Sequence, residues 1–220
     1  MKIDMHVHSS DFSPCGEISV AELVPLYRKA GFDGFALTDH FFRGGAEIRK
    51  KEGHPDFGKA YLEHFRRAEE SVRGTGFRIF LGLEMRFDES PDDFLVYGMP
   101  EDLFAQWDAL LAMGLKNFSA LAQERGFPVY QAHPFRDGIR IVNPAYLFGM
   151  EVVNGHSMFD NRNDIARAWA AKYDLHKIAG SDCHELCDLG SAGIETDETI
   201  RDTADLLRVL KTSNYRIFQA

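Results

Sequence analysis

The chain has 220 residues, of which 45% are hydrophobic and 27% are charged, the ordinary balance of a folded globular protein, so a disordered or fibrous chain is excluded. Its 25 basic and 34 acidic residues give a net charge of −9 without a basic stripe, which argues against a large nucleic-acid interface. No apolar run approaches the roughly 18 residues that a membrane span needs, and the opening MKIDMHVH has no apolar signal segment. Three cysteines are too few for a disulfide framework, so we expect reduced thiols and a cytoplasmic location. We expect a single domain spanning residues 1–220, which is ample for one buried core.

Short apolar runs alternate with amphipathic stretches along the chain. The expected strands are 2–7, 34–37, 78–83, 94–97, 128–131, 150–153 and 177–179. The expected helices are 19–31, which opens on a Ser19–Glu22 capping box and contains Pro25, then 57–73, 103–125 with a break at Gly114, 163–173 and 199–211. This alternation predicts a parallel α/β fold. Residues 85–93 are too few for a crossover helix, so strands three and four should join through a hairpin-like loop, and the barrel should be distorted.

Histidines and acids gather where the expected strands end. His6 and His8 end the first strand, Asp39 and His40 follow the second, Glu84 ends the third, His133 ends the fifth, and Asp182 and His184 follow the seventh. In α/β barrels the functional side chains collect at this carboxyl-terminal rim. Residues two apart on a strand also share a face, as His6 and His8 would.

Each of these residues has a plain structural explanation when it is taken alone. A His-x-His pair can be two surface histidines, Glu84 a solvated strand-end acid, and Asp182 a helix cap. Together they are better explained as ligands, because imidazoles and carboxylates suit Zn²⁺, Mn²⁺ and Fe²⁺. More than six such groups exceed the coordination of one tetrahedral ion, so at least two ions are expected. Two close ions suit the hydrolysis of a phosphoester.

The other histidines and the cysteines are expected to have other roles. His54, His64 and His176 are interpreted as solvated, whereas His156, in the loop after the sixth strand, stays open between solvated and functional. Cys183 and Cys187 are expected to pack. Cys15 lies in the loop after the first strand and is a candidate ligand.

Five motifs resemble the PHP family, the polymerase and histidinol phosphatase domains of metal-dependent phosphoesterases. They are MHVHSS at 5–10, TDH at 38–40, GLE at 82–84, AHP at 132–134 and GSDCH at 180–184. They follow the family order and span nearly the whole chain. The resemblance implies a distorted seven-stranded (β/α)7 barrel of the PHP type. It also implies two or three divalent metal ions (Zn, Mn or Fe) at the carboxyl-terminal rim.

The resemblance also implies roles for individual residues, with Glu84, His133 and Asp182 central to catalysis. His6, His8, Glu84 and Asp182 match the ligands of a first metal, Glu84 and His133 those of a second, and His40 and His184 those of a third. Cys15 stands where other members have a His or Asp ligand, with Asp11 as the alternative, and a thiolate is a good zinc ligand. The His that a full second site carries around strand four is absent from DFLVYGMP.

The leading functional hypothesis is hydrolysis of a small phosphate ester by a metal-activated hydroxide. Arg136, in HPFR, would bind the phosphate; the alternative is a surface arginine that pairs with Asp137. Two other functions are weighed. One is a non-catalytic metal-binding PHP module, favoured by the missing histidine, and the other is an amidohydrolase-type enzyme, which also opens with His-x-His. A nuclease is disfavoured by the net charge of −9. No membrane partner is expected, and the oligomeric state is left open.

Overall fold

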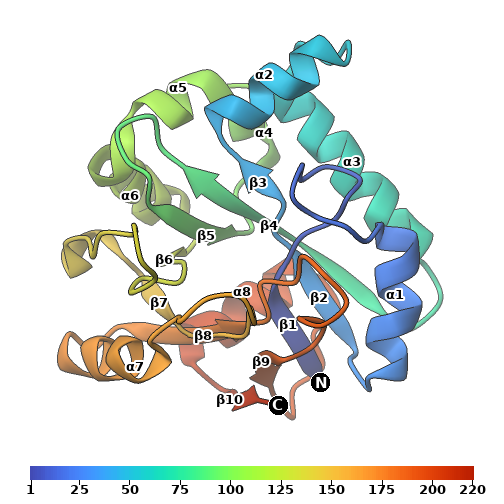
Figure 1. Ribbon diagram of the computed structural model, residues 1–220, viewed down its shortest axis with the longest axis vertical. Coiled ribbons are helices and arrows are strands. Elements are labelled where there is room, and N and C mark those ends of the chain that lie inside the picture. Colours follow the sequence, from blue (N-terminus) through green and yellow to red (C-terminus); the bar gives the residue numbers. More distant parts are fainter.

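The computed structural model describes residues 1–220, and its ten strands form one strongly curved, nearly closed sheet (Figure 1). The strands are β1 Lys2–Val7, β2 Gly34–Leu37, β3 His40–Phe41, β4 Arg78–Arg86, β5 Asp93–Tyr97, β6 Val129–Gln131, β7 Gly149–Asn154, β8 His176–Gly180, β9 Ala192–Glu195 and β10 Arg216–Gln219. The helices are α1 Val20–Lys29, α2 Arg43–Lys51, α3 Phe57–Ser71, α4 Glu101–Phe104, α5 Trp107–Ala112, α6 Gly114–Arg125, α7 Asn163–Lys172 and α8 Thr203–Thr212, with a 3₁₀ turn at Pro144–Tyr146.

The sheet runs in the order β10-β9-β1-β2-β4-β5-β6-β7-β8, with β3 paired to β4. β5 is antiparallel to β4 and β6, and β9 is antiparallel to β1 and β10, while the other neighbours are parallel. The link from β4 to β5 is too short for a crossover helix, so these two strands run antiparallel. The α/β class and the hairpin-like link are therefore confirmed. All seven expected strands form, but the seven-strand count is not confirmed, since β3, β9 and β10 add to the sheet. These three are only two to four residues long, too short for a readable alternation.

The two halves of β1 have different neighbours on one edge. The first half pairs with β9 through Lys2 and Ile3. The second half meets the segment after β8, where His8 N donates to Cys183 O at 3.1 Å and Cys183 N donates to His6 O at 3.2 Å. Gly180 makes this approach close, because a Cβ atom there would lie 2.3 Å from the Cβ of His6. The end of β8 is thereby held against the end of β1.

A buried carboxylate ties the same junction together. Asp4 accepts hydrogen bonds from the backbone N–H of His6 at 3.1 Å and of Ser181 at 2.9 Å, and from the hydroxyl of Tyr27 at 2.8 Å. Burial raises the pKa of Asp4 to about 6, against the effect of these bonds. Asp4 thus links β1, α1 and the segment after β8.

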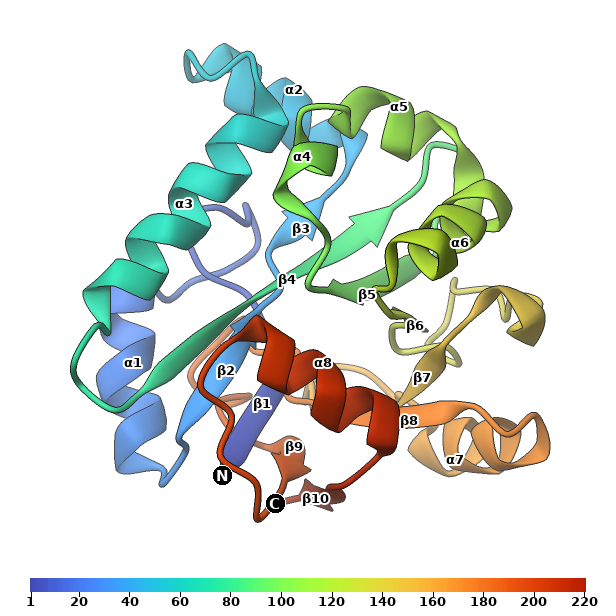
Figure 2. The same ribbon diagram turned by 180° about the vertical axis from the view of Figure 1, so that it is seen from behind.

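Two apolar cores lie on the two sides of the sheet. The larger one joins the outer face of the sheet to the surrounding helices, among them α1 and α3. The smaller one fills the barrel and includes Ile3, Phe80 and Leu95. Leu206 and Leu210 of α8 join this inner core, and Figure 2 shows α8 lying across the back of the barrel. The opposite, carboxyl-terminal rim is left for polar side chains.

The helices follow the expected pattern with three differences. The capping box forms, since Ser19 N donates to the Glu22 carboxylate at 3.1 Å, and α1 contains Pro25. The stretch expected as 103–125 divides into α4, α5 and α6, with Gly114 at φ +73° at the last break. The last helix begins at Thr203, four residues later than expected, and α2 was not expected because its RGG start is a poor helix former. None of the helices combines the length and apolar character that crossing a bilayer requires.

Candidate metal centre

The carboxyl-terminal rim brings together side chains from five parts of the chain. They are His6 and His8 of β1, His40 of β3, Glu84 of β4, His133 after β6, and Asp182 and His184 after β8. All are buried except His40 and His184, which are partly exposed. Burying so many ionisable groups is costly unless each is paired or binds a cation.

These side chains form three groups whose possible ligand atoms lie within 4.8 Å of one another. The groups are His6, His8 and Asp182; His8, His40 and His184; and Glu84, His133 and Asp93. The first two groups share His8. The pattern predicted from the strand ends is therefore a compact cluster in space.

Glu84 lies at the centre of the cluster. Its Oε1 is 2.9 Å from His133 Nε2 and 3.4 Å from His6 Nε2. Its Oε2 is 2.7 Å from His40 Nδ1 and 3.4 Å from His8 Nε2. One carboxylate thus reaches imidazoles of all three groups, as a bridging ligand would.

The two histidines of β1 are oriented by hydrogen bonds on their outer nitrogens. His6 Nδ1 lies 2.9 Å from Glu151 Oε1, and His8 Nδ1 lies 3.2 Å from the hydroxyl of Ser13. Both Nε2 atoms therefore face each other, 3.0 Å apart, inside the cluster. A carboxylate or hydroxyl on the far nitrogen is the usual support of a metal-binding imidazole. Glu151, buried in β7, was missed, because an acid in mid-strand carries no strand-end signal.

Polar groups behind the histidines of β1 hold Ser9 and Ser13 in place. One of these groups is His64, which was wrongly expected to be solvated. His64 of α3 is buried, with Nε2 2.8 Å from Asp39 Oδ2. Asp39 also accepts hydrogen bonds from the hydroxyls of Ser9 and Ser13, at 2.8 and 2.6 Å. Burial alone would raise the pKa of Asp39, but His64, His8 and Ser13 lower it to about 2. Asp39 therefore supports the ligands from outside the donor groups.

The backbone is unusual at two of the clustered residues. His133 has φ +27° and Asp182 has φ +53°, in the left-handed region that non-glycine residues rarely adopt. Such conformations cost about 1–3 kcal/mol and persist where the surroundings hold a side chain in a required place. Both residues turn away from the ends of their strands and into the cluster.

The charges of the cluster depend on one another. Burial opposes ionisation everywhere, yet His40 and His6 hold the pKa of Glu84 well below its usual range. The carboxylates Asp182, Glu151 and Glu84 raise the pKa of His6 well above its usual range despite burial. Burial and the neighbouring His184 and His40 lower the pKa of His8 to about 3. A cation bound here would replace the protons that the carboxylates otherwise hold on these imidazoles.

Two buried atoms at the centre have no hydrogen-bond partner: His133 Nδ1, and Glu84 Oε2, whose 2.7 Å approach to His40 Nδ1 is an ionic contact outside hydrogen-bond geometry. Buried polar atoms are almost always paired, so orphaned ones call for an explanation such as an ion. Together with three groups of imidazole and carboxylate donors, they show that the residues fit divalent metal ions.

Cys15 lies beside the group of His8, His40 and His184. The residue lies at the surface, and protein partly surrounds its thiol. Burial would raise the pKa of the thiol, but its interactions with His184 and His40 lower that pKa to about 6. The alternative ligand, Asp11, accepts a hydrogen bond from Val20 N on its Oδ2 at 2.7 Å, so one of its oxygens is bound at the start of α1.

Asp93 lies where the expected strand-four histidine is missing. It is the first residue of β5, is buried, and belongs to the donor group of Glu84 and His133. Both its oxygens accept hydrogen bonds from Arg86, at 2.8 and 2.7 Å. Burial and Glu84 raise the pKa of Asp93. Its only sequence signal was its place at the start of DFLVYG, opposite the GLE strand.

Arg136 enters the site but is held there by protein groups. Its guanidinium donates to Asp182 Oδ2 at 2.7 Å, Asn154 Oδ1 at 2.9 Å and Asn161 Oδ1 at 2.9 Å. The alternative pairing with Asp137 does not form, since Asp137 pairs with Arg162. Only 12% of the Arg136 side chain is exposed.

Of the remaining histidines and cysteines, His156 lies beside the cluster, and the others lie outside the donor groups. His156 is buried, with Nδ1 3.1 Å from Asp188 Oδ1, and its ring stacks on His184 at 5.1 Å. Cys183 is buried as expected, whereas Cys187 is exposed, so the expectation that Cys187 packs was wrong. His54 is exposed, and His176 is partly exposed.

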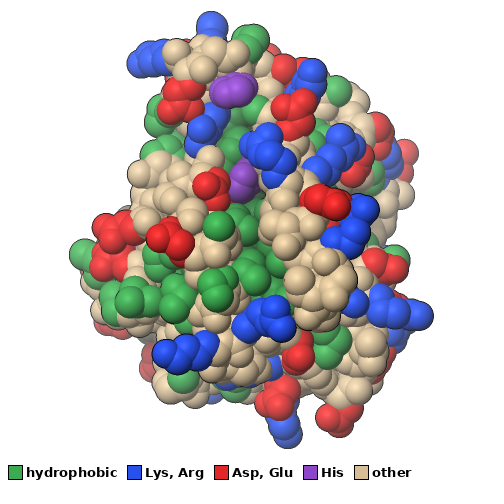
Figure 3. Space-filling model, turned by 90° about the vertical axis from the view of Figure 1, so that its right-hand side faces the viewer, with side chains coloured by type: hydrophobic (Ala, Val, Ile, Leu, Met, Phe, Trp, Pro, Cys, Tyr) green, Lys and Arg blue, Asp and Glu red, His purple; other side chains and the backbone are tan.

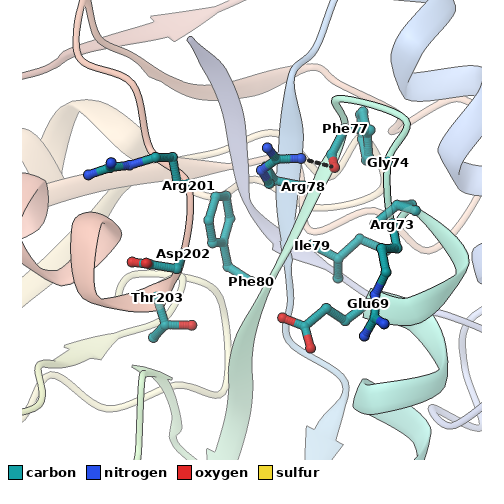
Figure 4. Close-up of a pocket in the computed structure, with 11 residues that line it drawn as sticks. Glu69, Arg73, Gly74, Phe77, Arg78, Ile79, Phe80, Arg201, Asp202 and Thr203 are labelled. Carbon is teal, nitrogen blue, oxygen red and sulfur yellow. Dashed lines mark hydrogen bonds between the residues drawn. The ribbon is translucent and has the colours of Figure 1, made fainter.

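A separate cleft of about 360 Å³ lies at the amino-terminal end of β4 (Figure 4). Arg73, Arg78 and Arg201 line it, but Arg73 pairs with Glu70 and Arg201 with Asp205. None of the clustered donors lines this cleft. On the face shown in Figure 3, basic and acidic side chains are interspersed, and no broad area carries one sign.

Comparison with known proteins gives one family match and several structural neighbours. Residues 160–215 match the model of the family described as PHP-associated. No curated protein matches the chain. A two-domain protein from Bacteroides vulgatus, said to contain a predicted PHP-like metal-dependent phosphoesterase, superposes with a TM-score of 0.73 at 19% identity. The match covers 100% of this chain and 64% of that protein, so this chain spans less than two thirds of its length.

Two further neighbours have other activities in their names. A lesion-specific endonuclease from Pyrococcus furiosus has a TM-score of 0.67 at 12% identity, covering 98% of this chain and 57% of that one. An amidohydrolase from Chromobacterium violaceum, solved with bound sulfate and no metal, has a TM-score of 0.55 at 16% identity, covering 100% and 98%. At these identities the likeness shows a shared fold.

Proposed function

We propose that this chain, whose family-model match and fold support the PHP domain family, hydrolyses a small phosphate ester with the help of two or three divalent metal ions. The observation that carries this proposal is Glu84, a buried carboxylate within 3.4 Å of imidazoles from all three donor groups. A carboxylate between close cations is what a multinuclear hydrolytic site needs.

The first metal would be held by His6, His8, Glu84 and Asp182, the second by Glu84, His133 and Asp93, and the third by His40, His184 and Cys15. Asp93 is proposed here in place of the missing histidine. When bound, these ions supply Lewis acidity that polarises a phosphoryl oxygen and lowers the pKa of water. Zn, Mn and Fe all suit such a donor set.

The chain's own residues prepare the site in three ways. Glu151 and Ser13 hold the Nδ1 atoms of His6 and His8, so that both Nε2 atoms face the cluster. Arg136 fixes one oxygen of Asp182 and leaves Oδ1, 3.3 Å from His8 Nε2, directed at the donors. The hydrogen bonds of Arg136 favour this positioning role, and its expected contact with phosphate stays a prediction.

A panel of phosphoesters tests the proposal. Chelated protein would be assayed with Mn²⁺, Zn²⁺ or Fe²⁺ added back, against nucleotides, sugar phosphates, histidinol phosphate, aryl phosphates and short oligonucleotides. We expect turnover of at least one small ester that depends on the added metal. Absence of turnover with every metal, while the ions still bind, would favour the non-catalytic metal-binding module.

Two other hydrolases are alternatives because structural neighbours carry these names. An amidohydrolase would turn over amides or lactams in a parallel panel and leave the phosphoesters intact. An endonuclease would prefer the oligonucleotides, which the net charge of −9 disfavours.

A further inference from the structure

A second arginine stands at the mouth of the metal centre. Arg86 is the last residue of β4, two residues after Glu84, so the two side chains leave the same face of the strand. Its Nε and Nη2 donate to the two oxygens of Asp93. Asp93 lies with Glu84 and His133 in one donor group. The guanidinium is therefore separated from the metal donors by a single carboxylate.

Arg86 keeps donors for a ligand. Its side chain is 40% exposed, although its partner Asp93 is buried. A guanidinium has five N–H donors, and Nη1 of Arg86 has no partner among the hydrogen bonds of the structure. The ring of Phe42 lies 5.6 Å from its central carbon and limits where the group can move.

The other arginine of the site is differently placed. Arg136 uses three hydrogen bonds on Asp182, Asn154 and Asn161, and its side chain is 12% exposed. If the guanidinium of Arg136 moved to bind a ligand, the buried carboxylate of Asp182 would lose the positive charge that pairs with it. Arg86 can meet a ligand without leaving Asp93.

An anionic substrate needs such a cation. Asp93, Glu84 and Asp182 surround the place where phosphate would meet the metals, and these charges repel a dianion. The ions would neutralise the oxygens nearest them, while an oxygen facing the mouth lies beyond their reach.

We propose that Arg86, held by Asp93, is the residue of this chain that binds the outward-facing oxygen of the phosphate group. The inference rests on the proposed function and adds a substrate-binding residue that the motifs did not indicate. Arg86 acts in binding the ester and the phosphate product, and Asp93 orients it.

Binding of inorganic phosphate to the Mn²⁺-loaded protein, measured by calorimetry, tests this role. A charge-assisted contact of this kind is worth a factor of roughly ten to one hundred in Kd, so Arg86→Ala should weaken phosphate binding by about that factor. Arg86→Lys keeps the charge beside Asp93 but loses the planar fork, and should recover only part of the affinity. Manganese content should be unchanged in both variants.

Arg43→Ala is the matched control. Like Arg86, Arg43 is partly exposed (38%), pairs with carboxylates and lies near an aromatic ring, at 5.4 Å. Its partners Asp88 and Asp108 differ from Asp93, because they are surface residues outside the donor groups. Phosphate binding by this variant should equal that of the parent.

Four results would overturn the proposal. Equal phosphate affinity in the parent and in Arg86→Ala would show that Arg86 does not touch phosphate, while the proposed function would stand. Loss of manganese from Arg86→Ala would mean that it only holds Asp93 for the metal. Failure of the loaded parent to bind phosphate or hydrolyse any ester would remove the proposed function as well. If the Ala variant does not fold, phosphate affinity of Arg86→Lys equal to that of the parent would overturn the role.

Discussion

Individual side chains in this site have properties that their neighbours impose. Glu84 stays ionised although it is buried, because the positive charge of His40 and His6 outweighs the cost of desolvation. Cys15 is a second case, since His184 and His40 lower the pKa of its thiol to about 6. Both residues can be tested singly.

Glu84→Gln keeps the size of the side chain and removes the charge that would hold two cations together. We expect loss of at least one ion per chain and a fall of roughly a hundredfold or more in kcat/KM, with the fold retained. Elemental analysis, circular dichroism and the phosphoester assay measure these effects. Asp92→Asn, which changes a buried carboxylate outside the donor groups, is the control. Activity within a few fold of the parent would show that Glu84 is not the bridge.

Cys15 should react as a thiolate when the metals are removed. With a pKa of about 6, roughly 90% of it is ionised at pH 7, against about 1% of an ordinary thiol with a pKa near 9. The rate of alkylation of the metal-free protein should therefore be nearly constant above about pH 7, where the thiol is ionised, and should fall below about pH 6, where the thiol is protonated. Added Zn²⁺ should protect the thiol. Mass spectrometry of the parent and of Cys15→Ala identifies the modified site, and alkylation unaffected by Zn²⁺ would transfer the ligand role away from Cys15.

At the scale of elements, closure of the sheet brings the ligands together. The end of β8 approaches β1 so closely that a Cβ atom at position 180 would meet the backbone N of His6 at 2.6 Å. His6 and Asp182 thus share one group because β1 and the segment after β8 are hydrogen-bonded. The site depends on this junction as much as on its own side chains.

Gly180→Ala should separate β8 from β1 at the metal centre. We expect the free energy of unfolding to fall by about 1–3 kcal/mol, and the content of metal to fall with it, because His6 must move. Gly53→Ala is the control: Gly53 has φ +92° and open space around it, so alanine there should cost about 1 kcal/mol and leave metal binding intact. Full metal content in Gly180→Ala would show that the junction does not set the position of His6.

At the scale of the whole molecule, buried negative charge sits at one end of a fold whose other end is closed by apolar packing. Glu84, Asp93, Asp182 and Glu151 are all buried at the carboxyl-terminal rim, while α8 fills the amino-terminal end. Without metal, protons on His6 and His40 and the side chains of Arg86 and Arg136 offset these charges. Metal ions, which only the folded chain can hold at this rim, would replace those protons. Metal binding and folding should therefore be coupled.

Chelation should lower the melting temperature, and added Mn²⁺ should restore it. An ion at 100 times its Kd contributes about 2.7 kcal/mol, which for a chain of this size raises Tm by roughly 5–10 °C per site. Calorimetry of the chelated and Mn²⁺-loaded protein measures the shift, and Glu84→Gln should show a smaller one. Identical Tm values with and without Mn²⁺ would contradict the coupling of metal binding to folding.

The sequence by itself determined the seven main strands, the hairpin-like link from β4 to β5 and the residues that meet at the rim, because strand ends and ligand types are local signals. It did not reveal the short strands β3, β9 and β10, which exist only through pairing with β4, with β1 and with β9, respectively. Nor did it reveal the roles of Glu151 and His64, whose surroundings come from distant segments. Only the tertiary structure decided that Arg136 is held by Asp182, 46 residues away in the sequence, and that Arg86 is held by Asp93, seven residues away, at the mouth of the metal centre. Both pairs form between separate elements, so they depend on how the strands curve together.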